Sequence, residues 1–418
     1  MVFKNRAEPF PKGLVLLMAA ACGFTVANVY LNQTLLVSMA NTFHVSENYI
    51  GIVATLTQVG YALGNLLLVP LGDIFERRKL ILSLLSIVCI ILAATALSMN
   101  VTWLIAANLI LGFVTIVPQI IVPLAANLAS EENRGKVLGN VAIGLVCGIL
   151  GARFISGFAD SHFGWRSMYW ASFAGTIIMI ILMAMYLPKS KGNHAMQYKK
   201  LLASLGPLFK KEKVLQKACL SQGMMFGSFS AFWTTLIFLL NTSPYSYGST
   251  VAGLIGLVGI AGAFATPMIG RVIDKKGSKF ANTLCMFISL IAFLIFIFLG
   301  FWLPGLILGA LLVTVGTQAN QVACQAAIFQ LSPEKRSRLN GLYMVSTFLG
   351  GSLGSYLGVL AWSKWHWYGV CTVGILMIGI AFSSLLSLPK QKTTVKNREF
   401  EKGSHIRCLK IKKTTKRD

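Results

Sequence analysis

The sequence nearly repeats itself at a spacing of about 202 residues, and each copy holds six apolar segments. Matching side chains recur in the same order in both copies: Asp73 and Asp274, Gln119 and Gln321, Gly148 and Gly350, Trp165 and Trp367. A duplication of this length indicates a fold made of two similar halves. If both halves consist of membrane helices, a central site can open to either side in turn. The repeat therefore favours a carrier.

The apolar segments are long enough to cross a membrane. Hydrophobic residues make up 55% of the 418 and charged residues only 12%, too little polar surface to cover a soluble core of this size. A helix needs roughly 20 apolar residues to span the hydrocarbon. The segments lie at 13–39, 49–71, 80–99, 102–128, 137–158, 167–187, 216–240, 249–270, 280–300, 302–329, 339–361 and 367–388. We therefore expect an all-α membrane protein with 12 transmembrane helices in two pseudo-symmetric six-helix bundles.

Basic polar stretches separate these bundles and end the chain. The expected domains are an N-terminal bundle at 1–188, a cytoplasmic linker at 189–213, a C-terminal bundle at 214–388 and a cytoplasmic tail at 389–418. Within the linker, Tyr198–Phe209 is either a short helix along the membrane or part of a solvated loop. The tail has too few apolar groups to fold alone.

The net charge of +24 is distributed as in a membrane protein. If the N-terminus is cytoplasmic, the segments on that side hold 34 of the 37 Lys and Arg residues. This asymmetry follows the positive-inside rule and predicts a multi-pass protein of the inner membrane with both termini in the cytoplasm. Nucleic acid is excluded as a partner, because no basic stripe lies on a surface away from the membrane.

The sequence offers no chemistry typical of an enzyme. Seven of the eight cysteines fall inside apolar spans, which indicates neither a disulfide framework nor a metal cluster. No nucleotide-binding loop or nucleophile–base pair is present. We expect no cofactor and no metal, so transport would use a gradient.

Two loops at equivalent places in the halves carry an aspartate followed by a basic cluster: Gly72–Lys79 and Gly270–Lys279. The second resembles the G-x-x-x-D-R/K-x-G-R/K-K loop of the major facilitator superfamily. The first departs from it at Val69 and Glu76, where glycines are usual. The resemblance extends from the first span to the twelfth and implies the major facilitator fold.

In that superfamily these loops form an inner latch that breaks when the carrier changes state. The resemblance implies a gating role for Asp73, Arg77, Arg78, Asp274, Lys275 and Gly277. An aspartate at a helix end can accept hydrogen bonds at the positive N-terminus of a neighbouring helix. The alternative is a basic loop that only orients the protein.

The resemblance also implies that spans one, four, seven and ten line the central cavity, and polar stripes on three of these spans agree with it. The candidate substrate-binding residues are Asn28, Asn32, Gln119, Arg153, Trp233, Gln318, Gln321 and Gln325. Polar groups inside a bilayer are costly unless they are paired or wetted. Hydrogen bonding between helices is the alternative role for each stripe residue, and lipid-facing packing is the alternative for Trp233.

The fifth span carries a further resemblance and one charge. Its glycines, among them the close-packing pair Gly144 and Gly148, resemble the antiporters' fifth-helix motif, although Ile149 stands where proline is usual. The sequence around Arg153 looks most like bacterial drug:proton antiporters of unassigned substrate. Arginine inside a bilayer costs about 2.5–3.5 kcal/mol. Arg153 either anchors an anionic substrate or a gate, or snorkels outward towards Asp160.

Proton coupling has little support from the residues themselves. None of the 13 acids lies mid-span, and the histidines fall in loops or the tail, so only Asp73 or Asp160 is placed to titrate at a gate. We expect a monomeric secondary transporter of a small organic molecule, driven by protons and acting in efflux. The alternatives are uptake or exchange of an organic anion, with Arg153 as counter-charge, and a non-transporting sensor.

Overall fold

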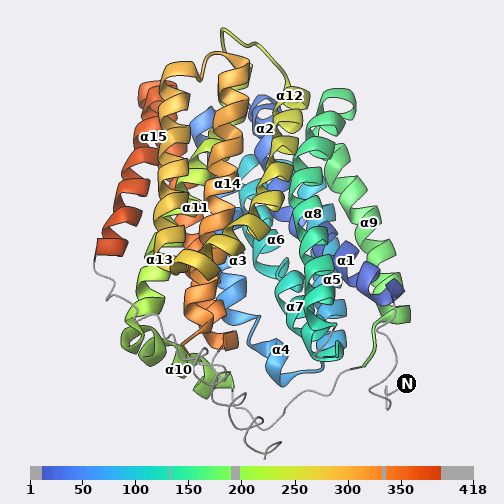
Figure 1. Ribbon diagram of the computed structural model, residues 1–418. Helices are drawn as coiled ribbons and strands as arrows, with labels where there is room; N and C mark the ends of the chain where they lie inside the picture. The colour runs from blue at the N-terminus through green and yellow to red at the C-terminus, as the bar shows by residue number, and fades with distance from the viewer. Residues whose placement is uncertain (1–11, 131–132, 190–197, 332–335, 387–418) are drawn as a thin grey trace, which may run out of the picture. The chain divides into compact units, whose positions relative to one another are not determined.

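The computed structural model describes residues 12–130, 133–189, 198–331 and 336–386, and these residues are mainly helical (Figure 1). The elements of the first half are α1 (Lys12–Tyr30), η1 (Leu31–Thr34), α2 (Leu36–Phe43), α3 (Glu47–Leu67), α4 (Leu71–Ile74), α5 (Arg77–Ala96), α6 (Val101–Val114), α7 (Val117–Leu128), α8 (Arg134–Phe163) and α9 (Trp165–Tyr186). Those of the linker and second half are α10 (Tyr198–Lys211), α11 (Lys213–Asn241), α12 (Ser249–Gly256), η2 (Leu257–Gly259), α13 (Ile260–Leu299), α14 (Leu303–Phe329) and α15 (Arg336–Leu386).

Ten helical segments in the described ranges are long and apolar enough to cross a membrane. The sequence predicted twelve, and the difference has two sources. One segment, Arg338–Ser384, covers two predicted spans and is broken at His366, whose φ of 48° is left-handed. The apolar helix Ser249–Gly259 is shorter than a span and continues directly into α13.

Two predicted spans of the first half are interrupted along their length. The span at 13–39 is divided into α1, η1 and α2, and the span at 102–128 into α6 and α7. Pro118 in the first turn of α7 has no N–H to donate, so it is suited to begin a helix and not to continue one. Interrupted helices leave backbone polar groups inside the bilayer that only protein or water can satisfy.

Small residues bring helices into backbone contact at matching places in the two halves. A Cβ added at Gly148 of α8 would collide with the backbone of Gly23 in α1. In the second half, a Cβ at Gly350 of α15 would collide with the backbone of Gly223 in α11. The predicted role of Gly144 and Gly148 in close packing is therefore confirmed, and both halves use the same device.

The linker contains a helix, α10, which includes the predicted segment Tyr198–Phe209. α10 buries Leu201, Leu205 and Leu208. The Tyr198 hydroxyl donates to the Leu67 carbonyl at 2.8 Å, and Nη1 of Arg338 donates to the Ser204 hydroxyl at 3.3 Å. The linker helix therefore contacts both halves. The N-terminal residues 1–11 and the predicted tail at 389–418 lie outside the described residues.

The halves also meet directly at the end of the helices where α3 begins and α8 finishes, here called the Glu47 end. Trp362 donates its indole N–H to Glu47 at 2.7 Å. Thr55 donates to the hydroxyl of Ser355 at 3.2 Å. The hydroxyls of Ser161 and Thr250 lie 2.5 Å apart. In this conformation the two halves are closed against each other at the Glu47 end.

Replacement of Gly148 by valine tests the backbone contact. The new side chain would force α1 and α8 apart, and overpacking of this kind costs about 1–3 kcal/mol. Gly148→Val should therefore lower the melting temperature of the purified protein by several degrees. Gly139→Val is the matched control, because Gly139 lies on the same helix with nothing within 4 Å of an added Cβ. Equal melting temperatures for the two variants would contradict the packing.

Candidate functional site

The side chain of Arg153 is buried at the place where the two halves meet. It is 1% exposed, and its Nε and Nη2 donate to Oε1 of Gln33 at 3.1 and 3.0 Å. The guanidinium carbon lies 4.2 Å from the centroid of the Trp233 ring, 5.2 Å from that of Tyr30 and 5.7 Å from that of Phe229. We call these five residues the Arg153 site.

The elements that build this site come from both halves. Arg153 lies on α8, Tyr30 ends α1 and Gln33 is in η1, all in the first half. Phe229 and Trp233 are one helical turn apart on α11 of the second half, so both rings face the same way. Gly256 of α12 lies against the Arg153 side chain, where an added Cβ would come within 2.8 Å. Movement between the halves would therefore take the site apart.

The positive charge of Arg153 has no acidic partner in the part of the chain that the structure describes. No carboxylate oxygen there lies within 4.0 Å of its guanidinium, and Asp160 instead accepts a hydrogen bond from Ser38 at 2.6 Å. Arg153 thus turns inward to Gln33. A buried cation held by an amide oxygen and aromatic faces is only partly compensated. The arrangement therefore suits an anionic group.

Several buried polar atoms near this level of the helices have no hydrogen-bond partner among the described residues. They are both amide atoms of Asn28, Oδ1 of Asn32 and Nε1 of Trp233. Asn28 is 1% exposed. Buried polar groups in proteins nearly always find a partner, so each such atom indicates a position where water or a ligand is needed.

Two other predicted substrate-binding residues of the first half form hydrogen bonds to side chains of neighbouring helices. Nδ2 of Asn32 donates to Thr57 at 2.8 Å and to Oδ1 of Asn108 at 3.4 Å. Nε2 of Gln119 donates to the Tyr61 hydroxyl at 3.4 Å. The alternative role of helix-to-helix hydrogen bonding is therefore realised by Gln119 and by the Asn32 amide nitrogen.

The second-half stripe is less enclosed than the first. Gln318, Gln321 and Gln325 are half-buried, and Gln325 donates to Asn340 at 3.3 Å. The buried polar cluster of α14 lies one position away, where Asn320 donates to Gln222 of α11 at 2.7 Å. Neither Asn320 nor Gln222 is among the predicted binding residues. The sequence position of Asn320, directly beside the polar stripe of the tenth span, could have identified it as a candidate.

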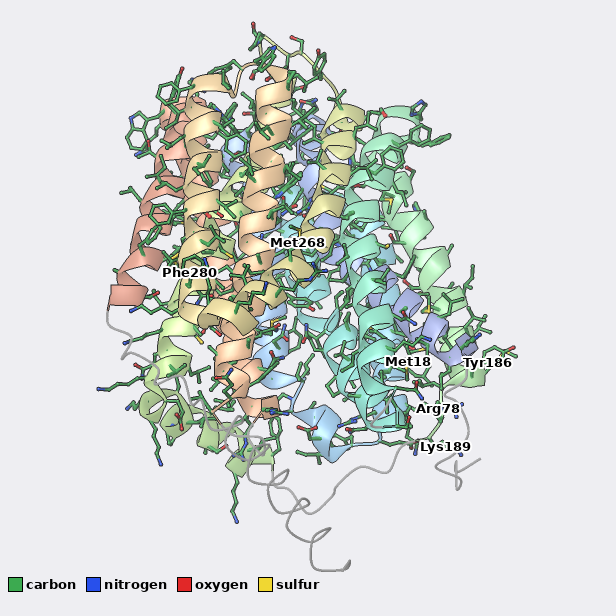
Figure 2. All side chains as sticks on the ribbon, viewed as in Figure 1. Met18, Arg78, Tyr186, Lys189, Met268 and Phe280 are labelled. Atoms are coloured by element: carbon green, nitrogen blue, oxygen red, sulfur yellow. The ribbon has the colours of Figure 1, made fainter. Side chains whose placement is uncertain are left out.

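The predicted gating residues lie at helix ends. Asp73 and Arg77 form an ion pair at 3.3 Å, and Nε of Arg77 donates to the Gly72 carbonyl at 3.0 Å. Arg78 donates to the carbonyl of Ala184 at the end of α9, near Tyr186 and Lys189 in Figure 2.

In the second half the equivalent loop is helical up to a break. Lys275 is exposed, and Gly277 has a φ of 83°, the left-handed conformation that glycine adopts most readily. The side chain of Asp274 lies outside the described residues.

Sequence reasoning missed three members of the Arg153 site as candidates: Tyr30, Gln33 and Phe229. Gln33 and Tyr30 lie beside the polar stripe of the first span, and Gln33 supplies the acceptor that holds Arg153. Phe229 had a signal in its spacing, since it precedes Trp233 by four residues. No group of three His, Cys, Asp or Glu side chains in the described ranges could hold a metal.

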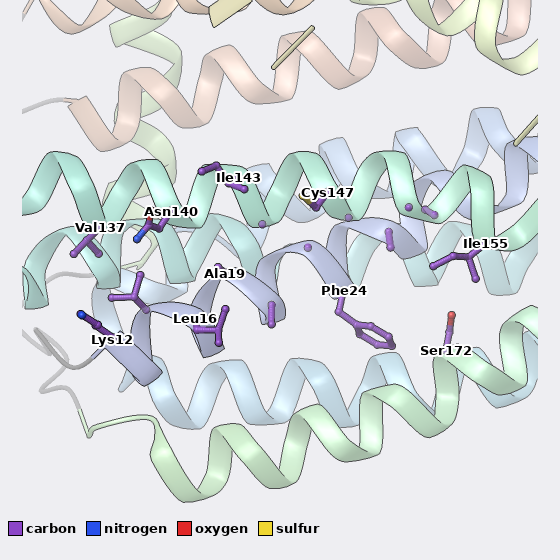
Figure 3. A pocket seen from close by; sticks show the side chains of 18 of the residues that line it. Lys12, Leu16, Ala19, Phe24, Val137, Asn140, Ile143, Cys147, Ile155 and Ser172 are labelled. Carbon is purple, nitrogen blue, oxygen red and sulfur yellow. The ribbon is translucent and has the colours of Figure 1, made fainter. Parts of the chain in front are cut away.

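A cavity of about 870 Å³ lies away from this site, between α1, α8 and α9 (Figure 3). None of the predicted substrate-binding residues lines it.

The comparisons with known proteins decide the family. The Major Facilitator Superfamily model matches residues 15–322 and 285–416. The chain belongs to this superfamily. It is 37% identical over 361 residues to the uncharacterized transporter YgaY of Escherichia coli O157:H7, covering 86% of this chain and 92% of that protein. A Streptomyces coelicolor protein named as a probable transporter is 33% identical, over 88% of this chain and 87% of its own length.

Solved structures support the major facilitator fold predicted from the sequence. A bacterial homologue of the human lysosomal transporter Spinster, inward-facing and occupied, matches with a TM-score of 0.72 at 13% identity, over 91% of this chain and 96% of that one. The nucleoside transporter NupG (D323A mutant) matches with a TM-score of 0.69 at 15% identity, over 90% and 98%. The protein is therefore a multi-pass membrane transporter of this fold.

Substitution of Gln33 tests how Arg153 is held. Gln33→Leu removes the acceptor of a buried cation, and an unsatisfied buried group of this kind costs about 1–3 kcal/mol or more. Gln33→Leu should therefore melt well below the parent protein, while Gln33→Glu keeps an acceptor and should melt near it. Gln330→Leu, at an exposed glutamine, is the control. A Gln33→Leu protein as stable as this control would rule out the proposed support.

Proposed function

We propose that this transporter moves a small organic solute by alternating access and binds it at the Arg153 site. The observation that carries the proposal is the buried guanidinium of Arg153, which has no carboxylate within 4.0 Å in the described residues and lies between the two halves. A solute bound there contacts both halves at once. Its binding and release are therefore linked to their relative movement.

The chemistry of the site favours a solute with an anionic group and an apolar or aromatic body. The guanidinium can pair with a carboxylate through two parallel hydrogen bonds. The rings of Tyr30, Phe229 and Trp233 surround the same position, and the unpaired Nε1 of Trp233 is a further donor. The amide of Asn28 offers both a donor and an acceptor. Gln318 and Gln321 extend this surface on α14.

Proton-coupled efflux is the direction we propose. A Helicobacter pylori protein named as a probable sugar efflux transporter is 23% identical over 86% of this chain and 90% of its own length. The resemblance of the fifth span to the drug:proton antiporter branch supports the same direction. Uptake or exchange of an organic anion is the second candidate, because the unpaired charge of Arg153 suits an anionic solute in either direction of transport.

The proposed topology has twelve crossings in two six-helix bundles. A crossing needs roughly 20 residues, so Arg338–Ser384, with its break at His366, is long enough for two. Ser249–Gly259 together with the part of α13 before Gly277 accounts for one more. The distribution of Lys and Arg assigns the Lys12 end of α1 to the cytoplasm and the Glu47 end to the outside.

The described conformation is then closed to the outside, with the gate residues on the cytoplasmic side. Asp73, Arg77 and Arg78, together with Asp274, Lys275 and Gly277, would latch the halves in the opposite state. The inward-facing Spinster homologue has the same fold. In the bilayer of the inner membrane, a monomer of this fold suffices for the cycle.

Transport in proteoliposomes tests the proposal. The probes are benzoate as an organic anion, ethidium as an organic cation and glucose as a neutral solute, each with an imposed pH step and an internal pH dye. Benzoate movement should be coupled to proton counter-movement. Arg153→Gln should lower kcat/KM for benzoate by about 30-fold, because loss of a buried charge partner costs about 2 kcal/mol or more.

Arg166→Gln is the matched control, since Arg166 donates to the carbonyls of Ala96 and Ser98 and lies over the Phe43 and Trp165 rings, none of which belongs to the Arg153 site. Ethidium or glucose transport unaffected by Arg153→Gln would contradict an anion-binding role. Benzoate exchange without proton movement would favour the second candidate. Absence of movement for every probe would favour a sensor on a carrier scaffold.

A further inference from the structure

We propose that the cavity between α1, α8 and α9 binds one anionic phospholipid of the cytoplasmic leaflet. This inference concerns a surface away from the Arg153 site and does not depend on which solute is transported. The cavity measures about 870 Å³. Its lining is apolar over most of its length and basic at one end. This pattern is complementary to an amphiphile with an anionic headgroup and an apolar chain.

Small residues create the floor of the cavity. Gly144 and Gly148 of α8 cross α1 at Ala19 and Gly23 so closely that no Cβ would fit at these glycines. Above such a crossing there is no side chain to fill the space between the helices. All four residues line the cavity. The close packing that holds α1 to α8 therefore also leaves a groove along their junction.

Large apolar side chains form the walls and are open to the surroundings. Leu16 is 71% exposed, Ile143 is 62% exposed and Ile155 is 54% exposed. On a helix that crosses a membrane, such side chains face hydrocarbon and not water. Figure 3 shows them along one cavity with Phe24 between α1 and α9. The groove therefore opens sideways to the lipid, whereas the Arg153 site is enclosed.

The basic and amide side chains are confined to one end, and Ser172 is the polar residue at the other. The basic and amide side chains are Lys12, Asn133, Lys136 and Asn140. Figure 3 places Lys12 and Asn140 together at one end, and Ile155 and Ser172 at the other. Lys12 and Lys136 lie in the first turns of α1 and α8, so the positive ends of both helices add to their charge. This end suits the phosphate of a lipid headgroup.

The cavity is long enough for a lipid from one leaflet, because its lining runs along α8 from Lys136 to Ile155, about 28 Å at 1.5 Å per residue. Half of a hydrocarbon core of about 30 Å is about 15 Å, or roughly ten residues of helix. Counted from Lys136 along α8, this depth reaches the neighbourhood of Cys147, which is exposed within the groove. The positive-inside distribution assigns Lys136 to the cytoplasmic surface, where anionic lipids attract basic groups.

Lipid titration of the full-length protein, followed by native mass spectrometry, tests the site. Phosphatidylglycerol should bind saturably with one lipid per chain and more tightly than phosphatidylcholine. Lys12→Gln/Lys136→Gln should weaken phosphatidylglycerol binding roughly 30-fold, since each lysine near the surface contributes about a factor of five. Lys210→Gln/Lys211→Gln, which removes the same charge from exposed positions of α10, should leave the binding unchanged.

A second pair of variants tests the acyl chain separately from the charge. Ile143→Trp fills the groove without altering any charge and should lower phosphatidylglycerol occupancy. Ile178→Trp, at another exposed apolar position on α9, should not. Equal weakening by both lysine pairs, or equal affinity for phosphatidylcholine, would overturn the proposal. Displacement of the lipid by soluble glycerol phosphate alone would also overturn it, because the groove would then have no part in binding.

Discussion

The buried guanidinium of Arg153 is the interaction on which the site depends. It extends from the first half of the chain to the aromatic rings of the second, with Gln33 as its acceptor. A cation in the bilayer interior has lost most of its hydration. The Gln33 amide and the aromatic rings replace part of that lost hydration where the halves meet. In the proposed cycle an anionic solute replaces the amide with a stronger charge-assisted pair, and it can thereby shift the balance between the two states.

Two of the predicted spans in the first half are not continuous helices. η1 follows α1 directly, and α6 stops three residues before α7 begins. Breaks of this kind cost hydrogen bonds in a bilayer and occur where protein surrounds them or where they line a cavity. Unlike the helix breaks, the tight glycine contacts between α1 and α8, and between α11 and α15, hold neighbouring helices together. In the proposed cycle, these contacts would let each half move as one body.

The repeat and the loop resemblance predicted the fold. Apolar length predicted the spans that the structure shows as ten helical segments in the described residues, because a helix in lipid must be apolar over a fixed length. Apolar length could not predict the helix breaks, although Pro118 was a local signal for one of them. The polar stripes identified Asn28, and the single charge inside a span identified Arg153; both side chains are buried. The stripes also selected Gln119, which bonds Tyr61 within the first half. Gln33 and Phe229 were missed because their importance comes from packing between distant segments, and no local pattern encodes that packing.

The most direct measurement is the distance between spin labels on the two halves at the Glu47 end, in lipid nanodiscs. Labels at Asn48→Cys and Ser363→Cys, two exposed positions next to the bond between Glu47 and Trp362, would report it once Cys147 and Cys408 are replaced by serine. Alternating access predicts a short distance for the closed state and a second, longer population whose share changes with pH and with a transported anion. A single distance that stays the same under all these conditions would contradict the account.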